Sequence, residues 1–132
     1  DVPHLRRMPV ILYVWDRFTR PCPLRPDIVV DIDPVAETKL EALHQHTSQV
    51  YEWLPYNVGL EHEVPEGDDA RLAWLRQRYM DRDRQRADQF RDKLIARYGE
   101  ERGKAVVHAE TVEISEYGAP LTESDEERLF PF

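Results

Sequence analysis

The histidines are the residues of this chain best suited to metal or acid–base chemistry, and their spacing decides what they can do. His44 and His46 would chelate a metal together from a strand, where alternate side chains share a face. On the helix expected there, the two side chains point about 200° apart, so the pair is a poor chelate. His62, between Glu61 and Glu63, lies in an expected loop and lacks the His-Glu-x-x-His spacing of helical zinc peptidases. Spacing alone therefore gives no metal site and no complete active site.

The remaining candidates for a functional site are polar residues beside apolar segments: His46, Gln49, Asp16, Arg7 and Glu110. His46 and Gln49 lie at the border of a core-facing helix, Asp16 ends a strand that Arg7 precedes, and Glu110 lies within an apolar strand. For four of these residues, an ordinary structural role is an alternative to a role in a functional site. His46 could be a hydrogen-bonded residue at a packing boundary, Asp16 a turn or cap residue, Glu110 an ion pair covering a sheet edge, and Arg7 a surface charge.

The stretch from residue 26 to residue 49 is expected to position most of these side chains. The β-branched run over residues 28–32 predicts a strand covered on both faces. Asp33 is a suitable helix N-cap and Pro34 a suitable first helical residue. An apolar stripe then predicts a helix that packs onto the sheet and that Pro55 ends or kinks; the stripe consists of Ala36, Leu40, Leu43, Thr47, Val50 and Leu54.

The rest of the chain predicts two more strands and a long charged helix. Residues 10–14 and 105–114 read as strands, and residues 121–132 as an acidic tail. The helix is expected over about residues 69–98, with Asp68 as N-cap and Gly99 as its stop. Its charged middle, residues 81–88, contains the pairs Asp81–Arg84 and Asp83–Arg86, which predict a solvated helix face.

Composition restricts the class of protein. The net charge of −8 argues against a general nucleic-acid binder, because binding phosphates requires a basic surface. The single Cys22 cannot form an internal disulfide, and no apolar run is long enough for a membrane span. A cytoplasmic protein is the default expectation.

The length fits one α/β domain over residues 1–132, with a strand-strand-helix core over 7–54, the long helix over 66–99 and a strand and tail over 105–132. In a parallel α/β sheet, the strands at 10–14 and 28–32 alone would be too few to cover themselves. The chain also begins at Asp1 and enters a strand almost at once. We therefore expect a fragment of a larger domain, whose exposed edges favour association into a homo-oligomer.

Two parts of the chain carry a combination of residues typical of one family. The first joins Val10–Tyr13, Asp16–Phe18 and Arg25–Ile32 to the motif Lys39-Leu40-x-Ala42-Leu43-x-x-His46-x-Ser48-Gln49. The second is Ala109-Glu110, followed by a short β-like run. Together they resemble the C-terminal part of the PIG-L/LmbE-like deacetylases, over most of residues 7–54 and again over about 105–121.

The resemblance implies a Rossmann-like α/β fold, of which this chain is the C-terminal part, with two or three strands and two main helices. It also implies zinc-dependent hydrolysis of an N-acyl group, commonly the acetamide of N-acetylglucosamine derivatives. The family's zinc ligands come from motifs of the His-Pro-Asp-Asp and His-Pro-Asp-His types. Neither motif occurs in this chain, so we assign it no zinc ligand and expect it to be inactive alone.

In the intact protein, the resemblance implies a pocket for an N-acylated amino sugar, completed by the missing N-terminal part of the same fold. His46 is the candidate catalytic residue, and Arg7 faces the same pocket. Gln49 and Asp16 would orient these two side chains, and Glu110 is a further candidate for substrate binding.

A second class of function remains open, namely a protein-interaction module without catalysis. The long charged helix and an aromatic cluster would then form the binding surface; the cluster consists of Tyr51, Trp53, Tyr56 and Trp74. Two His-Pro-Asp motifs encoded in frame before Asp1 would favour the enzyme, and a start codon directly before Asp1 would favour the module.

Overall fold

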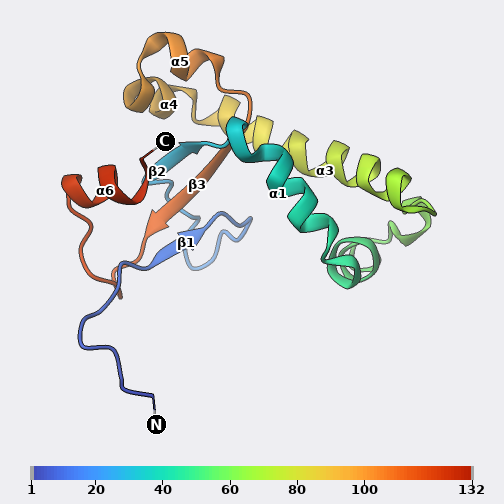
Figure 1. The fold of residues 1–132 in the computed structure, drawn as a ribbon, viewed down its shortest axis with the longest axis horizontal. Helices are drawn as coiled ribbons and strands as arrows, with labels where there is room; N and C mark the ends of the chain where they lie inside the picture. The colour runs from blue at the N-terminus through green and yellow to red at the C-terminus, as the bar shows by residue number, and fades with distance from the viewer. Residues whose placement is uncertain (1, 132) are drawn as a thin grey trace.

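A three-stranded antiparallel sheet lies at the centre of the computed structural model, which describes residues 2–131 (Figure 1). Its strands are β1 (Leu12–Val14), β2 (Ile28–Asp31) and β3 (Ala109–Ile114). The fold is mixed α/β, and its helices in chain order are α1 (Ala36–His44), α2 (Leu54–Asn57), α3 (Asp68–Gln89), α4 (Arg91–Tyr98), α5 (Glu100–Ala105) and α6 (Glu123–Leu129). Across residues 2–131, no helix combines the length and the apolar character that crossing a membrane requires.

The strand order is β1-β3-β2, with β3 in the middle and both of its neighbours antiparallel to it. Leu12 faces Ile114 in one pair of strands, and Ile28 faces Val112 in the other. The expectation of a parallel sheet is therefore wrong. The chain leaves β2, passes through α1 to α5, and re-enters the sheet beside β2 in the opposite direction.

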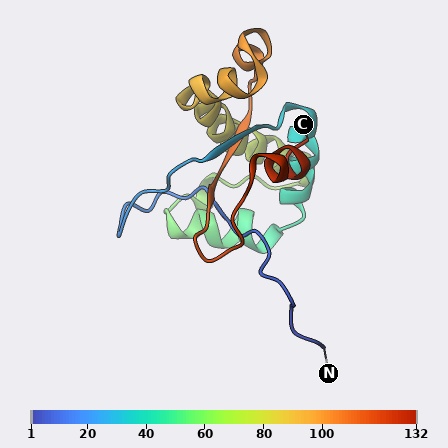
Figure 2. The ribbon, with the colours of Figure 1, turned by 90° about the vertical axis from the view of Figure 1, so that its left-hand side faces the viewer.

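Strand β2 is covered on both faces, as its β-branched composition predicts. Val29 packs with Ala87, Leu94 and Val106 on the α3–α4 side of the sheet. The opposite face is covered by the C-terminal segment: Ile28, Val30, Ile32 and Val112 pack with Leu121 and Phe130. In Figure 2, α6 lies in front of the sheet and α1 and α3 lie behind it. Burial on both faces makes β2 the best-covered strand.

The buried apolar residues of helix α1 pack against α3 rather than onto the strands, which corrects the expectation drawn from its apolar stripe. Leu40 is 1% exposed, and it shares a core with Leu75 and Met80 of α3. The stripe is also interrupted, because α1 ends at His44 and a π-helical turn follows over Ser48–Trp53. The change of helical repeat takes Thr47 out of the core while Val50 stays in it.

Asp33 does not cap the helix that it precedes, which corrects a second expectation. It lies in a 3-10 turn (Asp33–Val35), and its carboxylate accepts hydrogen bonds from distant backbone instead. The N–H groups of Val107 and His108 donate to it at 2.8 Å, and His108 Nδ1 lies 2.8 Å from Oδ1. Asp33 thus fastens the entry to β3 onto the end of β2.

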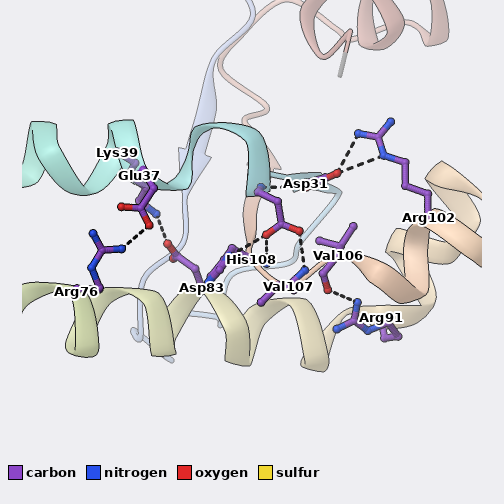
Figure 3. Close-up of polar contacts among 11 residues, drawn as sticks. Asp31, Glu37, Lys39, Arg76, Asp83, Arg91, Arg102, Val106, Val107 and His108 are labelled. Atoms are coloured by element: carbon purple, nitrogen blue, oxygen red, sulfur yellow. Dashed lines mark hydrogen bonds and ion pairs between the residues drawn. The ribbon is translucent and has the colours of Figure 1, made fainter.

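The long helix expected over residues 69–98 is two helices, because the backbone leaves helical geometry at Phe90 (φ −114°, ψ 31°). The helix begins at Asp68, after Gly67, so Asp68 is not the N-cap. Gly99 ends α4 at φ 83°, as predicted, and α5 begins directly afterwards. Arg91 fixes this corner, since its Nη1 donates to the carbonyl of Val106 at 2.6 Å (Figure 3).

Gly103 sets how closely α5 approaches α4. A Cβ added there would lie 2.5 Å from the Cα of Ile95, which is inside van der Waals contact with backbone. We expect Gly103→Ala to reduce the free energy of unfolding by about 1–3 kcal/mol, because the two helices must separate. Urea unfolding measures this, and Lys104→Ala on the exposed side of α5 should stay within about 0.5 kcal/mol of the wild type. Equal losses in the two variants would contradict the close approach.

The Asp33 carboxylate also predicts how stability depends on pH. Burial pushes the pKa of this carboxyl upward, but hydrogen bonds from Val107 and His108 outweigh burial and hold the pKa below its ordinary value. The stabilising contribution is therefore complete above the unfolded pKa of about 3.9 and is lost as the pH falls through the lower folded pKa. We expect the free energy of unfolding to fall less steeply below about pH 4 in Asp33→Asn than in the wild type. Matched slopes for Asp33→Asn and for the exposed control Glu52→Gln would show that this carboxylate is not involved.

Candidate functional site

A buried carboxylate on α3 organises the main polar cluster of the structure. Asp83 is 2% exposed, and both of its oxygens accept hydrogen bonds from cations. Lys39 Nζ of α1 donates to Oδ2 at 2.7 Å, and Arg86 Nη1 donates to Oδ1 at 2.7 Å (Figure 3 shows the contact with Lys39). Burying a carboxylate without partners costs several kcal/mol, and these two donors offset that cost for Asp83.

Lys39 extends the cluster to the sheet. Its ammonium group lies 2.5 Å from Oε1 of Glu110 on β3, as well as 2.7 Å from Asp83. The Lys39 side chain is 24% exposed and that of Glu110 47%, so this end of the cluster reaches solvent. One ammonium group thus connects α1, α3 and β3.

These charges line a cavity of about 300 Å³ between α1, α3 and β3, which we call the α1–α3–β3 cavity. Arg82 and Thr111 also line it, and its apolar and aromatic walls are formed by Val14, Trp15, Leu43, Tyr79 and Val112. Trp15 directly follows β1, and the guanidinium of Arg86 lies over its ring at 4.5 Å from the centroid. The cavity therefore combines accessible charged groups with an apolar wall, which is the usual composition of a small-molecule site.

The walls of the cavity offer groups for binding but no nucleophile paired with a base. Among its lining residues the one hydroxyl of an aliphatic side chain belongs to Thr111, which is 2% exposed. None of the lining residues is a serine, cysteine or histidine. Lys39 can donate hydrogen bonds to a ligand, and Glu110 can accept them.

Of the five predicted site residues, the structure places Glu110 in this cavity and none of the other four in its lining. Glu110 forms an ion pair with Lys39, and an ion pair was the structural alternative to a functional role for this residue. Asp16 accepts the N–H of Phe18 at 2.8 Å, which is the turn role open for it. Arg7 is exposed in the N-terminal segment, which Figure 1 shows running away from the body of the molecule.

His46 and Gln49 are exposed, and they lie between α1 and the end of the π-helical turn. The packing-boundary role expected of His46 belongs to His44 instead. His44 is 9% exposed, with Nδ1 2.6 Å from the hydroxyl of Tyr51 and Nε2 3.1 Å from Oδ1 of Asp68. His44 lies four residues after Leu40 and eight after Ala36, so it shares the buried face of α1, whereas His46 lies beyond the end of that helix.

Sequence reasoning missed Asp83 and Arg86, which it assigned to a solvated face. Both expected pairs exist, with Asp81–Arg84 at 3.0 Å and Asp83–Arg86 at 2.7 Å, but the second is buried. The available signal was position: Asp83 lies four residues after Tyr79 and four before Ala87, on the buried stripe of the helix. A charged residue in that register predicts a buried ion pair.

The part of the chain that the structure describes contains no set of side chains that could bind zinc. Among residues 2–131, no three His, Cys, Asp or Glu side chains lie together in an arrangement that could hold a metal ion. These residues do not offer the ligand set of the zinc site in the resembled family.

Comparison of the chain with protein-family models, with curated proteins and with solved structures finds no match. The resemblance described above therefore stays a prediction based on the residues that carry it.

Asp83 and Asp81 provide a matched pair for testing the cluster. We expect Asp83→Ala to lower the free energy of unfolding by about 3–5 kcal/mol, because it leaves the half-buried Arg86 and Lys39 short of a counter-charge. Asp81→Ala removes an exposed ion pair and should cost at most about 1 kcal/mol. Urea unfolding of both variants measures the difference, and similar losses would mean that Asp83 is not the buried anchor.

Proposed function

We propose that this chain is the C-terminal part of a hydrolase resembling the PIG-L/LmbE-like deacetylases, and that the α1–α3–β3 cavity belongs to the wall of its substrate pocket. The proposed reaction removes the N-acetyl group from an N-acetylglucosamine-type substrate. One observation supports the proposal above others: the Lys39–Glu110 ion pair. It brings together, at 2.5 Å, the two separate stretches that carry the resemblance, and it does so at the mouth of a cavity.

In this proposal the chain binds and orients the substrate. Lys39 and Glu110 exchange hydrogen bonds with sugar hydroxyls, while Trp15 and Val112 supply an apolar surface for the ring. His46 follows the cavity-lining Leu43 by one helical turn, and its N–H donates to the Leu43 carbonyl at 2.9 Å. Its exposed imidazole lies outside the cavity lining, and in this proposal it acts on a substrate that extends beyond the cavity.

The metal and the activated water belong to the remainder of the enzyme in this proposal. The zinc ligands of the resembled family lie in motifs that this sequence does not contain. We therefore assign His46 a role in proton transfer or substrate orientation only, with Arg7, Asp16 and Gln49 as further substrate contacts from the same part of the protein.

A protein-interaction module is the second candidate, and the exposure of two aromatic side chains favours it. Trp53, the last residue of the π-helical segment, is 55% exposed, and Tyr56, in α2 directly after it, is 71% exposed. The other two members of the aromatic cluster do not contribute to such a surface, because Tyr51 is buried and Trp74 packs against it at 6.1 Å between ring centroids. The binding surface of a module would therefore be smaller than the sequence predicts.

His46→Ala tests the enzyme proposal in a longer protein that contains this chain and two His-Pro-Asp motifs. We expect turnover to fall about a hundredfold, the usual effect of removing a group that transfers a proton. His62→Ala is the control, since His62 is also exposed but lies on the 3-10 turn Glu61–Glu63, away from the cavity lining. Deacetylation assays on both variants decide the role, and an unchanged turnover and KM in His46→Ala would remove His46 from the site.

A further inference from the structure

The α1–α3–β3 cavity carries more positive than negative charge on its walls. Its cations are Lys39, Arg82 and Arg86, and its carboxylates are Asp83 and Glu110. Lys39 and Arg86 are held by those two carboxylates. Arg82 has no acidic partner within 4 Å among residues 2–131, and its guanidinium lies over the ring of Tyr79 at 4.9 Å from the centroid. One positive charge on the wall is therefore left without a counter-charge.

The surplus of positive charge on the wall acts on Arg86 directly. Burial lowers the pKa of its guanidinium, and the attraction of Asp83 and Glu110 is opposed by repulsion from Arg82 and Arg17. A bound anion beside Arg82 and Arg86 would relieve that repulsion. The same wall contains two buried polar atoms without a hydrogen-bond partner, Nε of Arg86 and Oγ1 of Thr111. Native structures seldom leave such groups unpaired, and both residues line this cavity.

The remaining walls define the chemistry of that anion. Val14, Trp15 and Val112 present apolar surface to the same cavity, and a fully hydrated inorganic ion gains nothing from such contacts. A molecule with an apolar body and one carboxylate uses both parts of the wall. The volume of about 300 Å³ is at the lower end of the range for small-molecule sites, which restricts the ligand to a small one.

We propose that the α1–α3–β3 cavity binds a small organic carboxylate, with its anionic group between Arg82 and Arg86 and its apolar body against Trp15 and Val112. The carboxylate takes the surface that the proposed function gives to the sugar ring, so it binds in place of the ring; the proposal rests on that function only for the identity of the natural ligand. Hydrolysis of an N-acyl group breaks the C–N bond, places the oxygen of water on the acyl carbon and yields a carboxylate and an ammonium product. The proposed reaction thus generates a ligand of this class.

Binding is tested on the 132-residue chain by NMR, following the indole N–H signal of Trp15, which is assigned with Trp15→Phe. The probes are benzoate, its neutral analogue benzamide and inorganic phosphate. We expect a saturable shift with benzoate and at least tenfold weaker binding of benzamide and of phosphate. Equal binding of benzoate and benzamide, or no saturable shift with benzoate, would overturn the proposal. Phosphate binding as tight as benzoate would overturn the assignment to an organic carboxylate.

Variants on neighbouring positions of α3 locate the site. Arg82→Gln removes the cation without an acidic partner, and we expect it to weaken benzoate binding about tenfold, while Arg82→Lys retains most of the affinity. Arg84→Gln is the matched control, because Arg84 pairs with Asp81 and lies outside the cavity lining. An unchanged affinity in Arg82→Gln would overturn the proposal. If Arg82→Gln fails to fold, the comparison of benzoate with benzamide on the wild type decides whether the cavity binds an organic carboxylate.

The hydrolase proposal and the carboxylate-site proposal are tested by different experiments, so either can fail without the other. Benzoate binding requires no hydrolysis, so its absence would remove the carboxylate site and leave the His46 experiment as it stands. Loss of the proposed hydrolase function with benzoate binding intact would leave a carboxylate-binding site in a protein of another class.

Discussion

The position of one carboxylate holds this fold together, because Asp83 lies on the buried stripe of α3 where an apolar residue would be expected. A buried charge is tolerated only when opposite charges reach it with good hydrogen-bond geometry. Lys39 and Arg86 both do so at 2.7 Å, and Lys39 also binds Glu110. The requirement to satisfy Asp83 therefore fixes how α1 lies on α3 and how both helices meet β3.

The cavity follows from the same constraint. Charged side chains that converge on Asp83 cannot fill the space between α1, α3 and β3 as closely as aliphatic ones, and Trp15 covers Arg86 without closing the gap. The second anchor, Asp33, holds the start of β3 against the end of β2, so Glu110 meets Lys39 in a fixed register. The fold thus brings charged and apolar groups to one small site from four separate parts of the chain: the end of β1, α1, α3 and β3.

Local patterns in the sequence predicted local structure well. The β-branched run forms a strand buried on both faces, and Gly99 ends a helix. What failed depends on distant partners: the antiparallel pairing of β2 with β3, the partner of α1, and the donors to Asp33. Of the predicted site residues, Glu110 lines the cavity through an ion pair with Lys39, a distant part of the chain, whereas His46 lies beyond the end of α1 at His44 and outside the lining.

The most direct test of the account is a double-mutant cycle between Lys39 and Asp83, measured as the free energy of unfolding of Lys39→Met, Asp83→Ala and the double variant. If the buried ion pair fixes the junction of α1, α3 and β3, the two substitutions are strongly non-additive, and we predict a coupling free energy of at least about 1.5 kcal/mol. A coupling below about 0.5 kcal/mol, the range found for distant and independent sites, would contradict the account.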